Sequence, residues 1–201
     1  MLKPLPRLYR WLRRLSHRRG YGIHSPFAFQ LVTRVVYESG TFCAYAGPDA
    51  ERRDARLLRK DDRLLLRLAN DHRPDAIIAV GQQTDCSARY LAAGCRTATL
   101  TQLTADDPSD AARALREQGG AVLLFIDAGR RWPDIVSALL PHLTPQTLLV
   151  VRGIHHRPSL TREWKKLLRD PRTGITFDLG RLGLLYAPSE RTKQHYVVNY
   201  L

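Results

Sequence analysis

The sequence predicts a single α/β domain built on a mostly parallel sheet, and three observations lead to this prediction. The length of 201 residues fits one domain with a short appendage. From Asp75 onward, short apolar runs alternate with stretches of helical periodicity, which is the pattern of a parallel sheet with helices on both faces. The last two expected strands are separated only by 179–181, which is short enough for an antiparallel hairpin.

Residues 1–72 are expected to form a basic helical extension, and residues 73–201 the α/β domain. Leucines at helical spacing predict a first helix over 5–18. Ser25 and Pro26 are a good N-cap and first helical residue for a second helix that runs to about Tyr37. A loop is expected over 41–48, followed by helices near 49–59 and 61–71.

Within the α/β domain, 76–80 is an apolar run that ends in Gly81 and predicts a buried parallel strand. The same reasoning gives the remaining elements. Strands are expected at 96–101, 121–126, 146–151, 173–178 and 182–187, helices at 85–93, 108–118, 132–140 and 158–169, and a last extended piece at 196–200.

The charge of the chain predicts an anionic partner. The formal net charge is +13, the pI is about 10.3, and eight basic residues precede the first acid, Glu38. The basic N-terminal helix is either a solvated face docked on the domain or a contact for a membrane surface or nucleic acid. No nucleic-acid-binding module is recognisable.

The three cysteines, Cys43, Cys86 and Cys95, form no C-x-x-C pair, and an odd number argues against a disulfide framework or a zinc site. A reducing cytoplasm fits this usage. No stretch approaches the ~20 apolar residues of a membrane span, and the basic N-terminus lacks the apolar core of a signal peptide.

Three ordered segments carry a resemblance that spans nearly the whole chain. Residues 22–27 (GIHSPF) match the opening signature of a bacterial family of small methyltransferase-like proteins. Residues 125–131 (FIDAGRR) are similar to that family's FIDGNHR, and 176–179, 183–186 and 193–196 match its closing pattern. The chain thus resembles class I methyltransferases that use S-adenosyl-L-methionine (SAM), which implies a Rossmann-like sheet and descent from O-methyltransferases acting on small molecules.

The resemblance also implies roles for individual residues. Asp127 would help to orient the acceptor as well as bind the cofactor, and His155 matches a family histidine and would act as general base. The residues expected to bind SAM lie mainly in the turn after the first strand: Gly81, Gln82, Gln83, Ser87 and Asp127. For these residues the structural alternatives are a tight turn at Gly81, a capping role for Asp127 and a solvated loop position for His155.

The cofactor side departs from the family pattern in three places. Asp85 stands where a second glycine is expected, and Ala79 replaces the acid before the first glycine. The second strand ends without the acid that binds the ribose hydroxyls, so Asp106 or Asp107 would replace it only if the loop folds back. The segment before the next strand is so short that the family's third strand is expected to be deleted.

The acceptor side departs from the pattern at Arg152 and Gly153, where the family has paired acids. A guanidinium repels a metal ion, so no metal is expected. Arg152 would instead favour an anionic ligand, and Asp127, Arg152 and His155 are expected to converge on one pocket. Three functions therefore stay open. One is a SAM-dependent O-methyltransferase, and another is an inactive methyltransferase-like binding module for an anionic ligand, membrane surface, nucleic acid or protein. The third is a nucleic-acid-binding protein or RNA methyltransferase, which fits the charge of the chain but has no recognisable motif.

Overall fold

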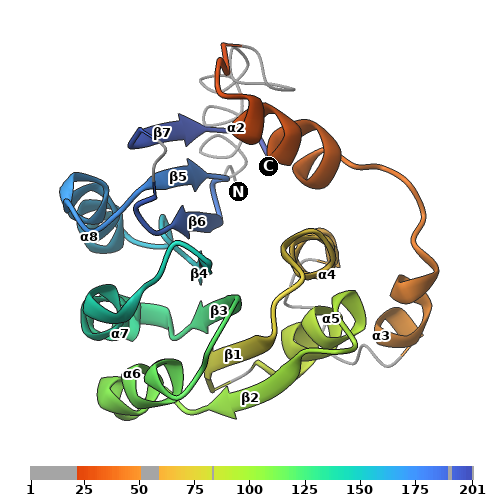
Figure 1. Cartoon of the computed structure of the whole chain (residues 1–201), viewed down its shortest axis with the longest axis horizontal. Coiled ribbons are helices and arrows are strands. Elements are labelled where there is room, and N and C mark those ends of the chain that lie inside the picture. Colours follow the sequence, from red (N-terminus) through yellow and green to blue (C-terminus); the bar gives the residue numbers. More distant parts are fainter. Residues whose placement is uncertain (1–21, 51–58, 83, 190–191, 201) are drawn as a thin grey trace, which may run out of the picture.

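The computed structural model describes residues 22–50, 59–82, 84–189 and 192–200, which form a seven-stranded sheet with helices on both faces (Figure 1). The strands are β1 (Ala76–Gly81), β2 (Thr99–Leu103), β3 (Val122–Asp127), β4 (Thr147–Arg152), β5 (Ile175–Asp178), β6 (Leu182–Tyr186) and β7 (Gln194–Val197). The helical segments are α2 (Pro26–Gln30), η2 (Leu31–Val36), η3 (Cys43–Tyr45), α3 (Ala46–Ala50), α4 (Arg59–His72), α5 (Asp85–Gly94), α6 (Pro108–Arg116), η4 (Gly129–Arg131), α7 (Trp132–Leu139), η5 (Leu140–His142) and α8 (Pro158–Arg169).

The strand order is β2-β1-β3-β4-β6-β5-β7. Strands β2, β1, β3 and β4 are mutually parallel, β6 is antiparallel to both β4 and β5, and β7 pairs with β5 in parallel at the far edge. The predicted mostly parallel sheet with a C-terminal antiparallel hairpin is therefore confirmed. Strand β2 is the other edge of this sheet, with no strand outside it among the described residues, as the expected loss of a third strand requires.

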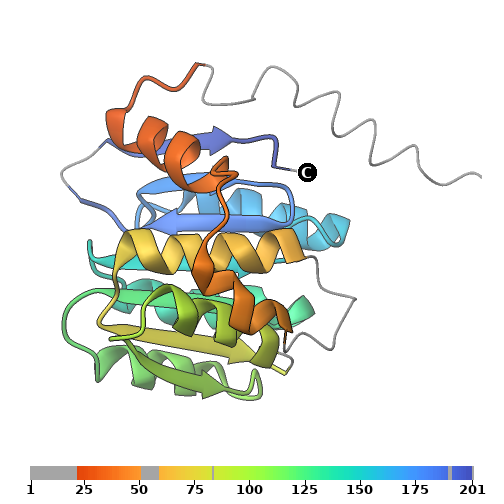
Figure 2. The same cartoon turned by 90° about the vertical axis from the view of Figure 1, so that its right-hand side faces the viewer.

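Two apolar cores lie on the two faces of the sheet. On one face, α6, α7 and α8 cover strand side chains such as Ile126 and Val151, and Trp132 and Trp164 are fully buried there. On the other face, α2, η2, α4 and α5 pack on residues such as Phe125 and Phe177. Figures 1 and 2 show the central sheet between these two layers. Buried strands on both faces explain the continuous apolar runs of the sequence.

Helix α4 forms because Leu64, Leu65 and Leu68 recur at helical spacing on its sheet-facing side, where all three are fully buried. It runs into β1 after a short turn, so it is antiparallel to that strand (Figure 2). The first turn of α4 therefore lies at the carboxyl ends of β1, β3 and β4. This edge of a parallel sheet is where such folds bind ligands.

The structure also differs in detail from the sequence expectations. Strand β2 covers 99–103 rather than 96–101, and the segment expected to be a loop over 41–48 contains η3 and the start of α3. The helix that begins with Ser25 as N-cap and Pro26 at its first position continues from Leu31 as a π-helical segment. The helix expected over 5–18 and most of that expected over 49–59 lie outside the described residues. In the part that the structure describes, no helix is long and apolar enough to span a bilayer.

Candidate functional site

Gly81 brings the ends of β1 and β3 into direct contact. It pairs in register with Asp127 and has φ +152°. A Cβ at this position would lie 2.3 Å from the carbonyl oxygen of Asp127, so no side chain fits without moving one strand. Gly81 is therefore required by strand packing, whether or not the turn that follows binds a ligand.

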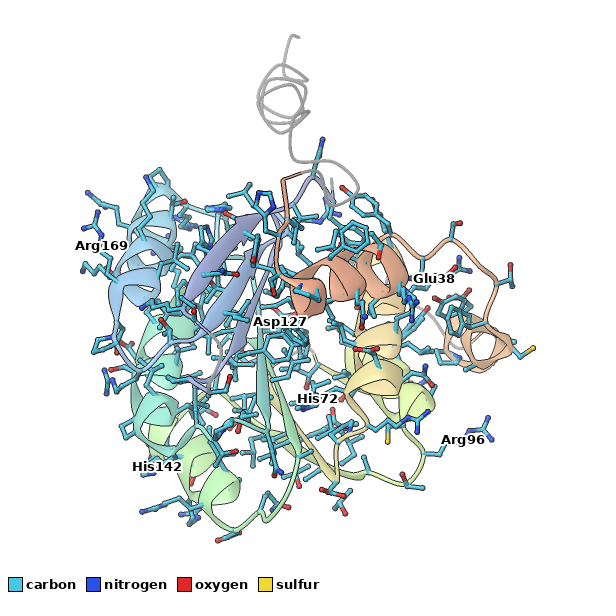
Figure 3. All side chains as sticks on the ribbon, turned by 45° about the horizontal axis from the view of Figure 1, so that its top comes forward. Glu38, His72, Arg96, Asp127, His142 and Arg169 are labelled. Atoms are coloured by element: carbon cyan, nitrogen blue, oxygen red, sulfur yellow. The ribbon has the colours of Figure 1, made fainter. Side chains whose placement is uncertain are left out.

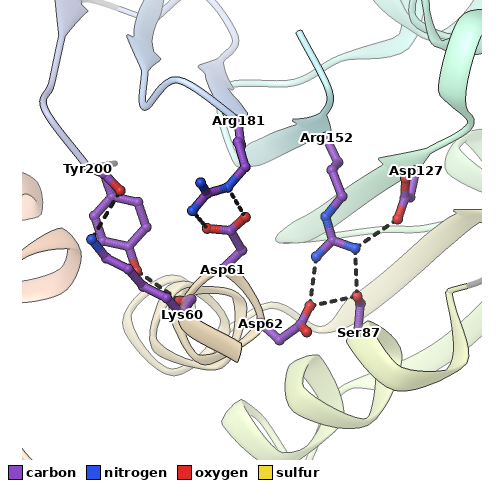
Figure 4. A network of polar contacts seen from close by, with 8 residues as sticks. All are labelled: Lys60, Asp61, Asp62, Ser87, Asp127, Arg152, Arg181 and Tyr200. Carbon is purple, nitrogen blue, oxygen red and sulfur yellow. Dashed lines mark hydrogen bonds and ion pairs between the residues drawn. The ribbon is translucent and has the colours of Figure 1, made fainter. Parts of the chain in front are cut away.

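Arg152, the last residue of β4, joins the two sides of this sheet edge (Figure 4). Its Nη1 donates to Asp127 Oδ2 at 2.7 Å, and its Nη2 donates to Asp62 Oδ1 at 2.6 Å. The guanidinium carbon also lies 4.9 Å from the centre of the Phe125 ring. One arginine thus bridges a carboxylate of the sheet and a carboxylate of α4. Figure 3 places the labelled Asp127 well inside the outline of the molecule, near the strand ends.

Ser87 completes this set of contacts from the first turn of α5. Its hydroxyl donates to Asp62 Oδ1 at 2.8 Å and accepts from Arg152 Nη1 at 3.0 Å. Ser87 and Asp62 are fully buried, and the Arg152 side chain is 10% exposed. We call Asp62, Ser87, Asp127 and Arg152 the edge network, because they share one set of hydrogen bonds at the carboxyl edge of the sheet.

The charge of Arg152 is stabilised by the two carboxylates of the edge network. Burial lowers the pKa of Arg152, but the carboxylates of Asp127 and Asp62 outweigh this effect and raise the pKa of the guanidinium on balance. Removing one member of a buried ion pair leaves the other charged and unpaired, which costs about 3–5 kcal/mol. A ligand that competed for Asp127 or Ser87 would have to offset a comparable loss.

The residues that follow β1 differ in their exposure and in their contacts. Gln82 and Asp85 are exposed, whereas Thr84 is buried and its hydroxyl donates to Gln102 Oε1 at 3.3 Å. Gln102 belongs to β2, at the strand end that lacks the acid expected to bind the ribose hydroxyls. Gln83 lies outside the described residues. The turn therefore contacts the end of β2 through an amide, and no carboxylate is present at that strand end.

Neither of the two later acids takes the place of the missing one. Asp107 is the N-cap of α6, and its carboxylate accepts from the Ser109 amide at 2.8 Å. This hydrogen bond lowers the pKa of Asp107. Asp106 accepts from Arg131 Nη2 through its backbone carbonyl at 2.6 Å. Both residues hold the loop between β2 and α6 in place.

His155 lies in a separate polar contact. Its Nε2 is 2.6 Å from Asp178 Oδ2, and its Nδ1 is 3.0 Å from Thr161 Oγ1. The hydrogen bonds and ion pairs found in the described part of the chain do not join it to Asp127 or Arg152. Of the three residues expected to converge, the structure brings Asp127 and Arg152 together and places His155 between the loop after β4, α8 and the end of β5.

The expectation that Arg152 is available to an anionic ligand is wrong, because its guanidinium is bound by two carboxylates of the chain itself. The sequence reasoning missed Asp62. The available signal was the adjacent pair Asp61 and Asp62 at the start of a helix whose other charged residues there are basic. Asp61 has a matching role, because it receives Arg181 Nε at 2.7 Å and Nη2 at 2.9 Å (Figure 4).

Among the described residues, no group of three or more His, Cys, Asp or Glu side chains gathers as metal ligands would. Asp127 faces the guanidinium of Arg152. An arginine stays protonated in proteins, so it repels a divalent cation from this position.

Solved structures share this fold. A putative O-methyltransferase from Klebsiella pneumoniae aligns with a TM-score of 0.56 over 82% of this chain and 97% of its own, at 14% identity. The SAH-bound methyltransferase PaMTH1 from Podospora anserina gives a TM-score of 0.53 over 83% of this chain and 97% of its own, at 16% identity. The O-methyltransferase TomG from Streptomyces achromogenes, in complex with SAM, gives 0.51 over 75% and 92%, at 15% identity.

Neither a protein-family model nor a curated protein sequence matches this chain. At identities this low, the structural likeness shows the fold alone. The chain has the Rossmann-like fold of class I methyltransferases, and its function has to be argued from its own residues.

Proposed function

We propose that this chain is a protein of the SAM-dependent O-methyltransferase type that has become a binding module and does not transfer methyl groups. The observation that carries this proposal is the bridge from Arg152 to both Asp62 and Asp127. The bridge occupies the carboxyl edge of the sheet, where this fold would hold the reacting groups.

The acceptor side supports the proposal. A metal-assisted methyltransferase needs clustered oxygen ligands that hold a cation beside the acceptor hydroxyl. Here a fixed guanidinium takes the position beside Asp127, and it can neither bind a metal nor accept a proton. The carboxylate of Asp127 is already engaged in an ion pair with this guanidinium.

The cofactor side supports it as well. SAM would need acceptors for its ribose hydroxyls and donors for its carboxylate. The end of β2 offers Gln102 in place of an acid, and Ser87 already donates to Asp62. The exposed carboxylate of Asp85 lies in the turn and would repel the carboxylate of SAM. The residues present therefore do not fit this cofactor well.

The second candidate is a SAM-dependent O-methyltransferase that keeps its cofactor. The neighbours TomG, bound to SAM, and PaMTH1, bound to SAH, favour it. In that case Gly81, Gln82, Gln83, Ser87 and Asp127 would contact SAM. Asp127 and His155 would then serve the acceptor, and Arg152 would have to leave its present position.

Calorimetric titration of the full chain with SAM and with SAH separates the two candidates. The first predicts no binding tighter than about 100 μM, which corresponds to roughly 5.5 kcal/mol. Saturable binding of either compound below that value would overturn the first candidate and support the second. TomG, titrated in the same buffer, is the positive control.

A further inference from the structure

A pocket lies beside α4, and none of the residues of the edge network line it. Its volume is about 350 Å³, within the range of small-molecule sites. The lining combines three cations of α4 with three tyrosines and one acid, here named the cation–tyrosine pocket: Lys60, Arg63, Arg67, Tyr37, Tyr45, Tyr200 and Glu38. In Figure 4, Lys60 and Tyr200 lie to one side of the Asp61–Arg181 pair and the edge network to the other.

Helical spacing explains why the three cations gather. Lys60, Arg63 and Arg67 are at positions i, i+3 and i+7 of α4, so they share one side of that helix. Asp62 instead turns toward Arg152. One helix thereby supplies a carboxylate to the closed sheet edge and three cations to the cation–tyrosine pocket.

Arg67 is the buried positive charge of this pocket. Its guanidinium donates to the carbonyls of Val35 at 2.7 Å and Val36 at 3.2 Å, and to the hydroxyls of Tyr45 at 3.0 Å and Tyr200 at 3.3 Å. All four acceptors are neutral, and no ion pair of the described residues joins Arg67 to a carboxylate. A buried charge without an opposite charge is costly, and a nearby anion would reduce that cost.

Lys60 and Arg63 stand at the same pocket with different partners. Lys60 Nζ donates to the Tyr200 carbonyl at 3.1 Å and lies 4.1 Å from the centre of the Tyr200 ring. Arg63 pairs with Asp49 through Nη2 and lies over the Tyr45 ring, while its Nε is buried and has no hydrogen-bond acceptor in the structure. An unpaired buried donor of this kind needs a further acceptor.

The positive charges at the pocket act on one another. Burial lowers the pKa of Lys60, and the charges of Arg181 and Arg67 lower it further against the opposing effect of Asp61. A negative charge bound at this pocket would be attracted by Lys60, Arg63 and Arg67 together.

We propose that the cation–tyrosine pocket binds a small organic acid, with its carboxylate near Lys60 and Arg63 and its apolar or aromatic body among the tyrosines. Arg67 adds to the positive field from the interior without touching the ligand. The cations in the lining favour an anion, and the three tyrosine rings favour an organic body over a bare ion. This site is independent of the edge network, so titration with SAM and titration with an acid test different parts of the molecule.

The test uses the full chain and benzoate as the probe, followed by calorimetry and thermal unfolding. We expect benzoate to bind with a dissociation constant below about 1 mM and to raise Tm. Lys60→Gln and Arg63→Gln should each weaken binding at least about tenfold. Lys166→Gln, which removes the same charge from the exposed surface of α8, should leave it unchanged. Lys60→Arg should keep most of the affinity.

Several results would overturn the proposal. Benzamide, the neutral analogue of benzoate, should not bind. Equal affinities for benzamide and benzoate would show that the carboxylate of the ligand is not recognised. Tighter binding of inorganic phosphate than of benzoate would show that the tyrosine rings do not select an organic ligand. The absence of benzoate binding by the wild-type chain would contradict the proposal. Equal binding by all variants, each with the circular dichroism spectrum of the wild type, would show that benzoate binds outside this pocket.

Discussion

Arg152 shows how a single residue can join three polar groups at the carboxyl edge of the sheet. A guanidinium presents several donors in a rigid plane, so it can hold two carboxylates and a hydroxyl at once. Asp62, Asp127 and Ser87 receive those donors within 3.0 Å. A lysine would offer a point charge and could not span the same partners with the same geometry.

Arg152→Met tests this role, because methionine keeps the length of the side chain and removes its charge. Asp62 is fully buried and would lose the guanidinium that pairs with it. We expect the free energy of unfolding in urea to fall by about 3–5 kcal/mol. Arg113→Met is the control, since Arg113 forms an exposed pair with Asp110, and it should change stability by at most about 0.5 kcal/mol. Equal effects of the two substitutions would show that the edge network is not a buried ion-pair system.

His72 predicts a pH dependence of stability. Burial lowers the pKa of His72 below 6.5, although the carbonyls of Val122 and Gln146 and the charge of Asp71 partly oppose this. Between its folded-state pKa and about 6.5, the unfolded chain binds more protons than the folded chain. Stability should therefore fall as pH falls through that window.

The measurement for His72 is the urea midpoint at about pH 7.5 and about pH 5. The drop between these two values should shrink in His72→Gln and persist in His142→Gln, which makes the same exchange in the turn after α7. A drop of the same size in His72→Gln would assign the pH dependence to other groups.

At the residue scale, the sequence predicted Asp127 and Arg152 as neighbours, because parallel strands end at one edge. It did not predict that they would neutralise each other. Asp62 lies 65 residues before Asp127 in the chain, and only the antiparallel approach of α4 to the sheet brings them to one cation. Contacts of this kind depend on tertiary packing, which local patterns do not encode.

At the scale of elements, a substitution at Gly81 tests the close contact between the ends of β1 and β3 most directly. An alanine Cβ would overlap the Asp127 carbonyl, and φ +152° is strained for a residue with a side chain. We expect Gly81→Ala to lower the free energy of unfolding by about 1–3 kcal/mol. Gly119→Ala is the matched control, because a Cβ there meets nothing within 4 Å. Chemical denaturation of both variants checks this, and an unaffected Gly81→Ala would mean that the two strand ends are further apart.

The elements that the sequence predicted best are those whose residues are buried on both sides. Strands β1, β3 and β4 are apolar except at their ends, where Asp127, Thr147 and Arg152 lie, and their bounds agree with the expected ones to within a residue or so. Strand β2 was placed too early because it is exposed and rich in threonine, so burial leaves no apolar run to mark it. The sequence predicts a loop over 41–48 because the short helical segments η3 and α3 have no amphipathic period.

At the scale of the whole molecule, the fold and the edge network depend on different residues. The fold follows from the alternation of apolar strands and amphipathic helices, and it is shared with O-methyltransferases of different sequence. The proposed loss of methyl transfer depends instead on a few strand-end residues, Asp127 and Arg152 above all. The basic helix expected over 5–18 lies outside the described residues. Its two interpretations, a solvated face docked on the domain or a contact for a membrane surface or nucleic acid, therefore stay predictions.

The central claim is that the polar groups at the carboxyl edge bind one another and leave no site for the cofactor. Amide chemical-shift mapping of the full, isotopically labelled chain during titration with SAH tests this claim residue by residue. We predict no saturable shift changes at 81–87, Asp127 or Arg152. Saturable changes centred on these residues would contradict the account and show that the edge network opens to admit the cofactor.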